Sequence, residues 1–139
     1  MKTVLVFGVF DFFHPGHRFF LNAARKLGDR LFVVVARDFT VEVEKKIRPH
    51  FSEKVREKEI EKTGIADRVF LGNRGDKFKI VREIAPEIVA LGFDQKCDEQ
   101  KLREILPAVE IHRIPPNHPE KFKSTIFRKK LKSERISKR

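Results

Sequence analysis

Short apolar runs alternate with charged stretches along this chain, and each run predicts a β-strand. The run at 4–10 is continuous and rich in β-branched residues, and the run at 30–37 is similar. Apolar runs without polar alternation are typical of strands that are buried on both faces. Shorter runs at 67–72, 86–92 and 109–115 complete a set of five predicted strands.

Amphipathic or charged stretches with helix-forming residues separate these runs. The helix predicted at 14–27 has apolar residues at helical spacing and Gly28 as its stop, and the helix at 52–63 begins with the N-cap residue Ser52. Further helices are predicted at 77–85, at 98–106 and from Ser124 onward, whereas residues 38–51 are assigned to no element.

Strands that alternate with helices in one small chain predict an α/β fold. We expect a Rossmann-like, doubly wound, five-stranded parallel sheet with helices on both faces. Such sheets bind ligands at the carboxyl ends of their strands. Three polar stretches fall there: "GVFDFFHPGH" after the first strand, "ARD" after the second and "LGFDQK" after the fourth.

Length and charge narrow the class of protein. The chain has 139 residues, which suits one domain, and no apolar run is long enough to span a membrane. Its single cysteine, Cys97, fits a reducing cytoplasm. Residues 121–139 carry nine Lys or Arg against one Glu, so this segment contributes +8 of the net charge of +11. Because the rest is nearly balanced, nucleic-acid binding is disfavoured, and we expect a domain at 1–132 followed by a solvated basic tail at 133–139.

The two histidines of "GVFDFFHPGH", His14 and His17, are three residues apart around a Pro-Gly pair. Zinc-binding histidines on a helix are usually four apart with a third ligand in reach, so no metal ligand is assigned. One interpretation is structural: His14 ends a turn, and Pro15 and Gly16 begin a helix. The other is that the unpaired N–H groups of the helix start bind a phosphate, which Gly16 admits closely and the histidines flank as donors.

Two motifs resemble those of a known enzyme superfamily. "GVFDFFHPGH" resembles the G-x-F-D-x-x-H-x-G-H motif of the HxGH nucleotidyltransferases, which are cytidylyltransferase-like. "KSTIFR", at 123–128, is similar to their S-S-T-x-I-R motif but departs from it at Lys123 and Phe127. Stretches at 33–41, 66–72 and 86–96 look most like the archaeal-type FAD synthetases, which transfer AMP from ATP to FMN and release pyrophosphate.

The resemblance implies roles for individual residues. As catalytic groups it implies His14 and His17 on the α- and β-phosphates of ATP, with Lys46 and Arg128 neutralising the pyrophosphate; Lys45 is an alternative to Lys46. Asp38 is placed to meet the acceptor or to cap a helix, and Asp11 to orient a turn or the histidines. The nucleotide-binding set implied is Val9, Phe10, Asp11, His14, Pro15, Gly16, His17, Gly92, Asp94, Ser124, Thr125 and Arg128.

The resemblance also implies the partners and leaves the acceptor open. Mg²⁺ is expected as the cofactor, held mainly by the triphosphate, and Phe12, Phe13 and Phe39 are candidates to line a flavin ring. Glycerol-3-phosphate cytidylyltransferases share the first motif, and a sugar phosphate is another candidate acceptor. A catalytically silent nucleotide-binding protein, whose basic tail contacts RNA or lipid, is a further alternative. A homodimer is compatible with the family.

Overall fold

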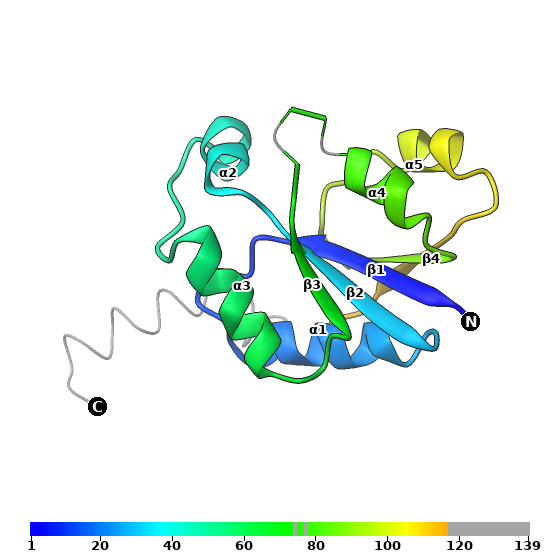
Figure 1. Ribbon diagram of the computed structural model, residues 1–139, viewed down its shortest axis with the longest axis horizontal. Coiled ribbons are helices and arrows are strands. Elements are labelled where there is room, and N and C mark those ends of the chain that lie inside the picture. The colour runs from blue at the N-terminus through cyan, green and yellow to red at the C-terminus, as the bar shows by residue number, and fades with distance from the viewer. Residues whose placement is uncertain (74, 77, 117–139) are drawn as a thin grey trace.

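The sheet of this protein is parallel, as the alternation of apolar runs and helices predicted. The computed structural model describes residues 1–73, 75–76 and 78–116, and Figure 1 shows its elements. Five strands are hydrogen-bonded in the order β3-β2-β1-β4-β5, and all four pairings are parallel. Their bounds are β1 Thr3–Gly8, β2 Arg30–Val35, β3 Arg68–Leu71, β4 Ile88–Gly92 and β5 Glu110–Ile114.

Five helices are described, and four of them were predicted. Their bounds are α1 Pro15–Arg25, α2 Asp38–Lys45, α3 Glu53–Lys62, α4 Lys79–Ile84 and α5 Glu99–Ile105. Helix α2 was not predicted, because its sequence "DFTVEVEK" contains three β-branched residues with modest helix propensity. A contact from far along the chain assists its start: the N–H of Asp38 donates to the Glu53 carboxylate at 2.8 Å.

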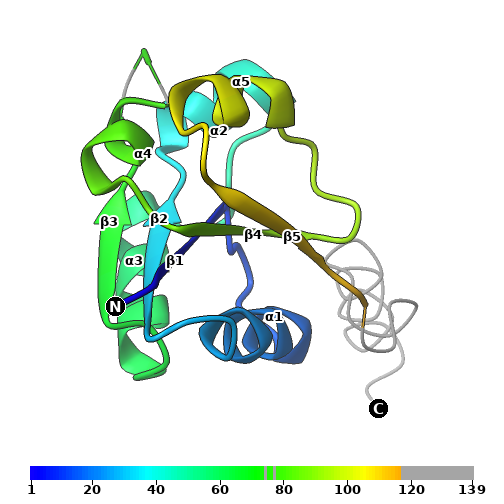
Figure 2. The same ribbon diagram turned by 90° about the vertical axis from the view of Figure 1, so that its right-hand side faces the viewer.

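The helices cover the two faces of the sheet, as Figure 2 shows: α1 and α3 lie on one side, and α4 and α5 on the other. Alternate residues of β1 feed the two cores. Val4 and Val6 pack with α1 and α3, whereas Leu5 packs with α4 and α5, and all three side chains are fully buried. The doubly wound fold class is therefore confirmed.

The carboxyl edge of the sheet opens between β1 and β4. The strand order reverses there, and crevices at such points bind ligands in doubly wound folds. β1 pairs with β2 along all six of its residues, but with β4 only at Val4 and Leu5. Beyond that point the Gln95 side chain spans the two strands, donating to the Phe7 carbonyl at 2.7 Å and accepting from the Gly92 N–H at 3.0 Å.

Some predictions fall outside the described residues. The helix expected from Ser124, the "KSTIFR" motif and the boundary between the domain and its tail all lie in 117–139. Within the part of the chain that the structure describes, no helix is long and apolar enough to cross a membrane.

Candidate active site

The two histidines stand at the start of α1, at the carboxyl end of the central strand β1. His14 is the N-cap of the helix: its Nδ1 accepts from the Gly16 N–H at 3.1 Å. His17 reciprocates, because its Nδ1 accepts from the backbone N–H of His14 at 3.4 Å. The two rings stack with their centroids 3.8 Å apart. This is a capping box built from histidines, and Pro15 occupies the first helical position.

This capping fixes the chemical form of both rings. A neutral imidazole whose Nδ1 accepts a hydrogen bond carries its proton on Nε2. Burial lowers the pKa of His14 to about 4, and burial together with the charge of the nearby His14 lowers the pKa of His17 to about 3. Both rings are therefore neutral Nε2–H donors near pH 7. The structural and functional interpretations of the pair are compatible, because the cap uses Nδ1 and leaves the donor function to Nε2.

The loop between β1 and α1 is held in an unusual backbone conformation. Phe10 and Phe12 have positive φ angles of 55° and 51°, which cost about 1–3 kcal/mol each in residues with bulky side chains. β1 accordingly ends at Gly8, two residues earlier than predicted. The buried Asp11 carboxylate accepts from the N–H groups of His50 and Phe51, at 2.7 and 3.0 Å. Asp11 thus orients the backbone at His50 and Phe51, and its place in the nucleotide-binding set stays a prediction.

The contacts of Asp38 connect it to a buried arginine. Its carboxylate accepts from Arg56 Nη2 at 2.6 Å and from the Glu53 N–H at 3.2 Å. Asp38 is the first residue of α2 and not its N-cap, which is Arg37. The helix-cap alternative for Asp38 is therefore wrong in its detail, because the carboxylate meets the N-terminus of α3 instead of its own helix.

The lysines with predicted phosphate contacts lie where α2 ends. Lys46 is the C-cap of this helix and has a left-handed backbone, with φ 57°. Lys45 and Lys46 are both exposed. The segment that follows them, up to Phe51, returns to the loop before the histidines through the two hydrogen bonds to Asp11.

The turn after β4 carries Gly92 and Asp94, and Asp94 is exposed. Gln95 ties this turn to β1, and Arg113 Nη1 donates to the carbonyls of Gly92 (2.8 Å) and Gln95. Both groups were missed by the sequence analysis. The structure thus brings the histidine motif and the Gly92–Asp94 turn to the same edge of the sheet.

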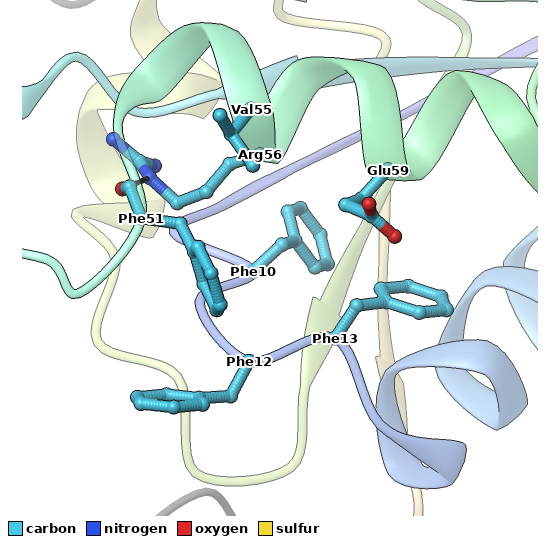
Figure 3. A pocket seen from close by; sticks show the side chains of 7 residues that line it. All are labelled: Phe10, Phe12, Phe13, Phe51, Val55, Arg56 and Glu59. Atoms are coloured by element: carbon cyan, nitrogen blue, oxygen red, sulfur yellow. Dashed lines mark hydrogen bonds between the residues drawn. The ribbon is translucent and has the colours of Figure 1, made fainter.

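An apolar pocket of about 280 Å³ adjoins the loop between β1 and α1, residues 9–14, which we call the histidine loop (Figure 3). Four phenylalanine rings, one valine and two charged residues line it: Phe10, Phe12, Phe13, Phe51, Val55, Arg56 and Glu59. The rings of Phe10 and Phe13 also contact the ring of His17, with centroids 5.4 and 5.6 Å away. Phe12 and Phe13 were candidates for a flavin site, and the structure groups them. Phe39 is not among the lining residues and is 58% exposed.

Ser124, Thr125 and Arg128 lie outside the described residues, so their predicted contacts with phosphate stay predictions.

Among residues 1–73, 75–76 and 78–116, no three His, Cys, Asp or Glu side chains come together as a metal site requires.

A histidine-capped helix start at the end of the first strand of a doubly wound sheet agrees with the family comparison. Residues 5–139 match the family model described as "Cytidylyltransferase-like". The chain belongs to the cytidylyltransferase-like family.

Similar proteins of this cytidylyltransferase-like family include archaeal enzymes. The chain is 48% identical over 104 residues to the "FAD synthase" of Aciduliprofundum boonei, a match that covers 75% of this chain and 69% of that protein. It is 42% identical over 135 residues to the "FAD synthase" of Thermoplasma volcanium, covering 94% of each.

Solved structures agree with the fold. A Thermoplasma volcanium protein described as a lipopolysaccharide core biosynthesis protein is 41% identical, with a TM-score of 0.78, over 84% of this chain and 98% of that chain. Thermotoga maritima TmcAL, bound with alpha-thio ATP, has a TM-score of 0.64 at 15% identity, over 97% of this chain and 51% of that chain, and supports the fold alone.

Proposed function

We propose that this chain is an FMN adenylyltransferase, which transfers AMP from ATP to FMN to give FAD and pyrophosphate. The proposal rests on one combination: a neutral histidine pair caps the helix at the carboxyl end of β1, in a chain 42–48% identical to archaeal proteins named FAD synthase. The histidine site supports nucleotidyl transfer, and the relatives support the acceptor.

The chemistry follows from the placement of the donors. An oxygen of the FMN phosphate attacks the α-phosphorus of ATP, a new P–O bond forms, and the bond to the β-phosphate oxygen breaks. Pyrophosphate leaves with the electron pair, so no covalent enzyme intermediate is needed. Charge that develops on the transferring phosphoryl group is stabilised by the Nε2–H groups of His14 and His17 and by the N–H groups at the start of α1.

Cations complete the proposal. ATP enters as its magnesium complex, in which the triphosphate oxygens hold the metal. Lys46 and Arg128 neutralise the departing pyrophosphate, and Ser124 and Thr125 donate to the β- and γ-phosphates. Asp94 contacts the nucleoside from the turn after β4. These assignments use the family motif, and substitution of each residue tests them.

The pocket beside the histidine loop supports a flat aromatic acceptor. The isoalloxazine ring of FMN is planar and aromatic, with an apolar dimethylbenzene end, and four phenylalanine rings line the pocket. Phe10 and Phe13 contact both this pocket and the ring of His17. A ring bound there has its ribityl chain available to reach the start of α1. Glycerol 3-phosphate has no group that uses such a surface.

The test measures pyrophosphate release with ATP or CTP, each combined with FMN, glycerol 3-phosphate or heptose 1-phosphate. We expect turnover with ATP and FMN, and FAD as the product separated by chromatography. Turnover with CTP and glycerol 3-phosphate, but none with ATP and FMN, would overturn the proposal. Turnover with heptose 1-phosphate alone would assign the acceptor to a sugar phosphate. No turnover with any pair would favour a silent nucleotide-binding protein.

A further inference from the structure

A buried arginine that the sequence pattern did not single out joins the loop before the histidines to the starts of two helices. Arg56 lies in the first turn and a half of α3 and is 1% exposed. Its guanidinium uses all three nitrogens. Nη1 donates to the Val9 carbonyl at 2.9 Å, Nε to the Phe51 carbonyl at 2.9 Å, and Nη2 to the Asp38 carboxylate at 2.6 Å.

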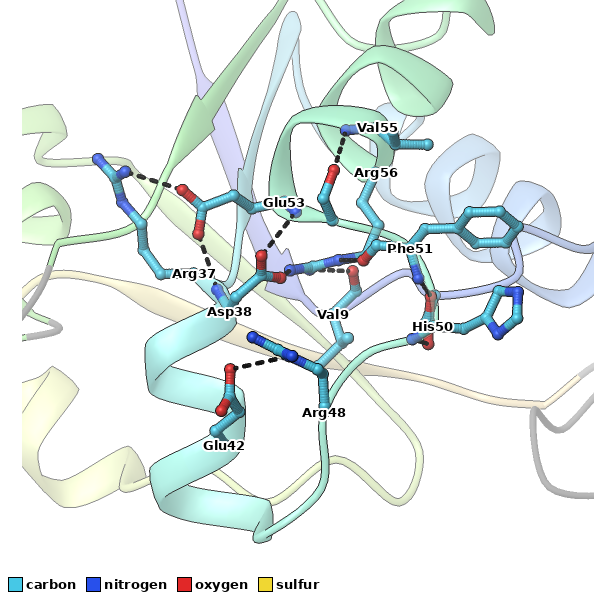
Figure 4. A network of polar contacts seen from close by, with 12 residues as sticks. Val9, Arg37, Asp38, Glu42, Arg48, His50, Phe51, Glu53, Val55 and Arg56 are labelled. Atoms are coloured by element: carbon cyan, nitrogen blue, oxygen red, sulfur yellow. Dashed lines mark hydrogen bonds and ion pairs between the residues drawn. The ribbon is translucent and has the colours of Figure 1, made fainter.

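The acceptors of Arg56 come from three separate segments, as Figure 4 shows. Val9 begins the loop that leads to His14, Phe51 ends the segment that carries Lys46, and Asp38 begins α2. One rigid, planar group therefore fixes the relative positions of these three segments. A lysine cannot do this, because its single ammonium group lacks the fork geometry of a guanidinium.

A second carboxylate completes the network. Asp38 and Glu53 are the first residues of α2 and α3, and each accepts the backbone N–H of the other, at 2.8 and 3.2 Å. Both helix N-termini thereby gain a negative charge, which their dipoles favour. The second oxygen of Glu53 pairs with Arg37 at 3.1 Å, and Arg37 Nε donates to the Gly72 carbonyl at 2.7 Å, just beyond β3.

The strained loop before the histidines needs such support. Its two left-handed phenylalanines, Phe10 and Phe12, persist only if the surroundings over-determine the backbone. Arg56 holds the loop at Val9, and the 50–51 backbone holds it at Asp11. Since Arg56 also holds the Phe51 carbonyl, the histidine loop and the segment that carries Lys46 are fastened to the same point.

We infer that Arg56, paired with Asp38, is a positioning residue: it sets the histidine pair relative to the Lys46 segment so that both engage one triphosphate. This inference rests on the proposed function and assigns Asp38 to the network instead of to acceptor binding. Arg56 acts through the histidines and does not touch the reacting atoms.

The test compares Arg56→Lys and Asp38→Asn with Arg82→Lys, a matched control. Arg82 pairs with Asp76 on the surface of α4, on the other face of the sheet. For both network variants we expect kcat to fall, about tenfold or more for Arg56→Lys and less for Asp38→Asn. Because Asp38 is not among the residues that line the apolar pocket, KM for FMN should stay within about twofold of wild type in Asp38→Asn. The control should leave both constants unchanged. A raised KM for FMN with unchanged kcat in Asp38→Asn would return Asp38 to the acceptor site and overturn the inference.

A double-mutant cycle separates positioning from loss of stability. If Arg56 acts through the histidines, Arg56→Lys should lower kcat at least about tenfold in the wild-type background and less than about twofold in a His17→Ala background. Equal losses in the two backgrounds would contradict the inference. Unfolding temperatures of all variants, measured at the assay conditions, confirm that folded protein is compared.

Histidine side-chain NMR gives a readout that needs no substrate. In Arg56→Lys, the ring ¹⁵N shifts of His14 and His17 should change, whereas those of His112 on β5 should stay in place. Unchanged shifts for His14 and His17 would overturn the inference. If the wild-type protein makes no FAD, the proposed function fails, but this measurement still decides whether Arg56 holds the histidines.

Discussion

Arg56 and Arg82 are both arginines that pair with an aspartate, but they belong to opposite faces of the sheet. Arg56 is buried under α3 with three acceptors from three segments, whereas the Arg82–Asp76 pair lies on the surface near α4 with both side chains about half exposed. The same chemistry thus has two uses. On the surface an ion pair contributes little, because water and salt screen it. In the interior, the hydrogen bonds of Arg56 fix the positions of three backbone segments.

The two faces differ in the same way as a whole. The described buried polar and charged side chains are Thr3, Asp11, His14 and Arg56, and three of these four hold the loop and helix start that follow β1. The core beneath α4 and α5 consists of apolar side chains. The face covered by α4 and α5 therefore contributes mainly to stability. The polar residues that hold the candidate active site belong to the other face, at the carboxyl edge of the sheet.

The largest effect is expected from Arg56→Met, which removes the buried partner of an ion pair and takes away the donors that Arg56 supplies to the Asp38 carboxylate and to two carbonyls. Breaking such a pair costs about 3–5 kcal/mol of unfolding free energy. Arg82→Met should cost at most about 1 kcal/mol. Urea unfolding followed by circular dichroism measures both. Similar losses of unfolding free energy in the two variants would contradict the expected difference between the interior pair and the surface pair.

A smaller effect, read out in catalysis, is expected from His17→Ala. Loss of one donor to the transition state typically lowers kcat by about 10²–10³-fold. KM for ATP should change by only a few fold, because the N–H groups at the start of α1 still meet the phosphates. Steady-state kinetics with ATP and FMN measure the split, with His112→Gln as the control on the exposed part of β5. A raised KM for ATP with unchanged kcat would place His17 in ground-state binding instead.

The smallest effect, taken per histidine and per pH unit, is a pH dependence of stability. The pKa values of His14 and His17 are about 4 and 3 in the folded protein, below the unfolded value of about 6.5. Below pH 6.5 the unfolded chain therefore binds protons that the folded chain does not, so stability falls as the pH falls towards 3. Each histidine contributes a slope of up to about 1.4 kcal/mol per pH unit in this window.

Urea unfolding between pH 4.5 and 7.5 tests this, with the double variant His14→Gln/His17→Gln for comparison. The variant should lose the part of the slope that the two histidines contribute. If the variant keeps the wild-type slope, other groups govern the pH dependence of stability. The assignment of His14 and His17 as neutral in the folded protein would then be wrong.

Much of the fold was predictable, because buried strands and helix starts have recognisable residue patterns in the local sequence. A strand covered on both faces is apolar where it is buried, and β1 from Val4 and β2 from Leu31 are so. Ser52 was predicted as the cap of α3, and its hydroxyl accepts from the Val55 N–H. The start of α1 was likewise signalled by Pro15, although its histidine capping box has no counterpart among the usual capping residues.

Other features have no recognisable pattern in the local sequence. Arg56 stands in "SEKVREKEIEKT", where it is one charged residue among eight and looks like part of a solvated helix face. Helix α2 starts beside a carboxylate fifteen residues further along, and Gln95 acts on a carbonyl 88 residues away. Local patterns carry no information on partners at such separations, which is why the contact between Asp38 and Arg56 was not predicted.

The sequence by itself determined the alternation of strands and helices, the position of the histidine motif after the first strand and the family to which both belong. These follow from short-range periodicity and from residues adjacent in the chain. Only the tertiary structure decided which arginine is buried, which carboxylates face each other across two helix starts, and that both histidines cap their helix through Nδ1 and so carry the proton on Nε2. The arginine and the carboxylates depend on side chains that meet only when the sheet has closed. The histidine cap is local, but its low pKa values depend on the loss of water that folding brings.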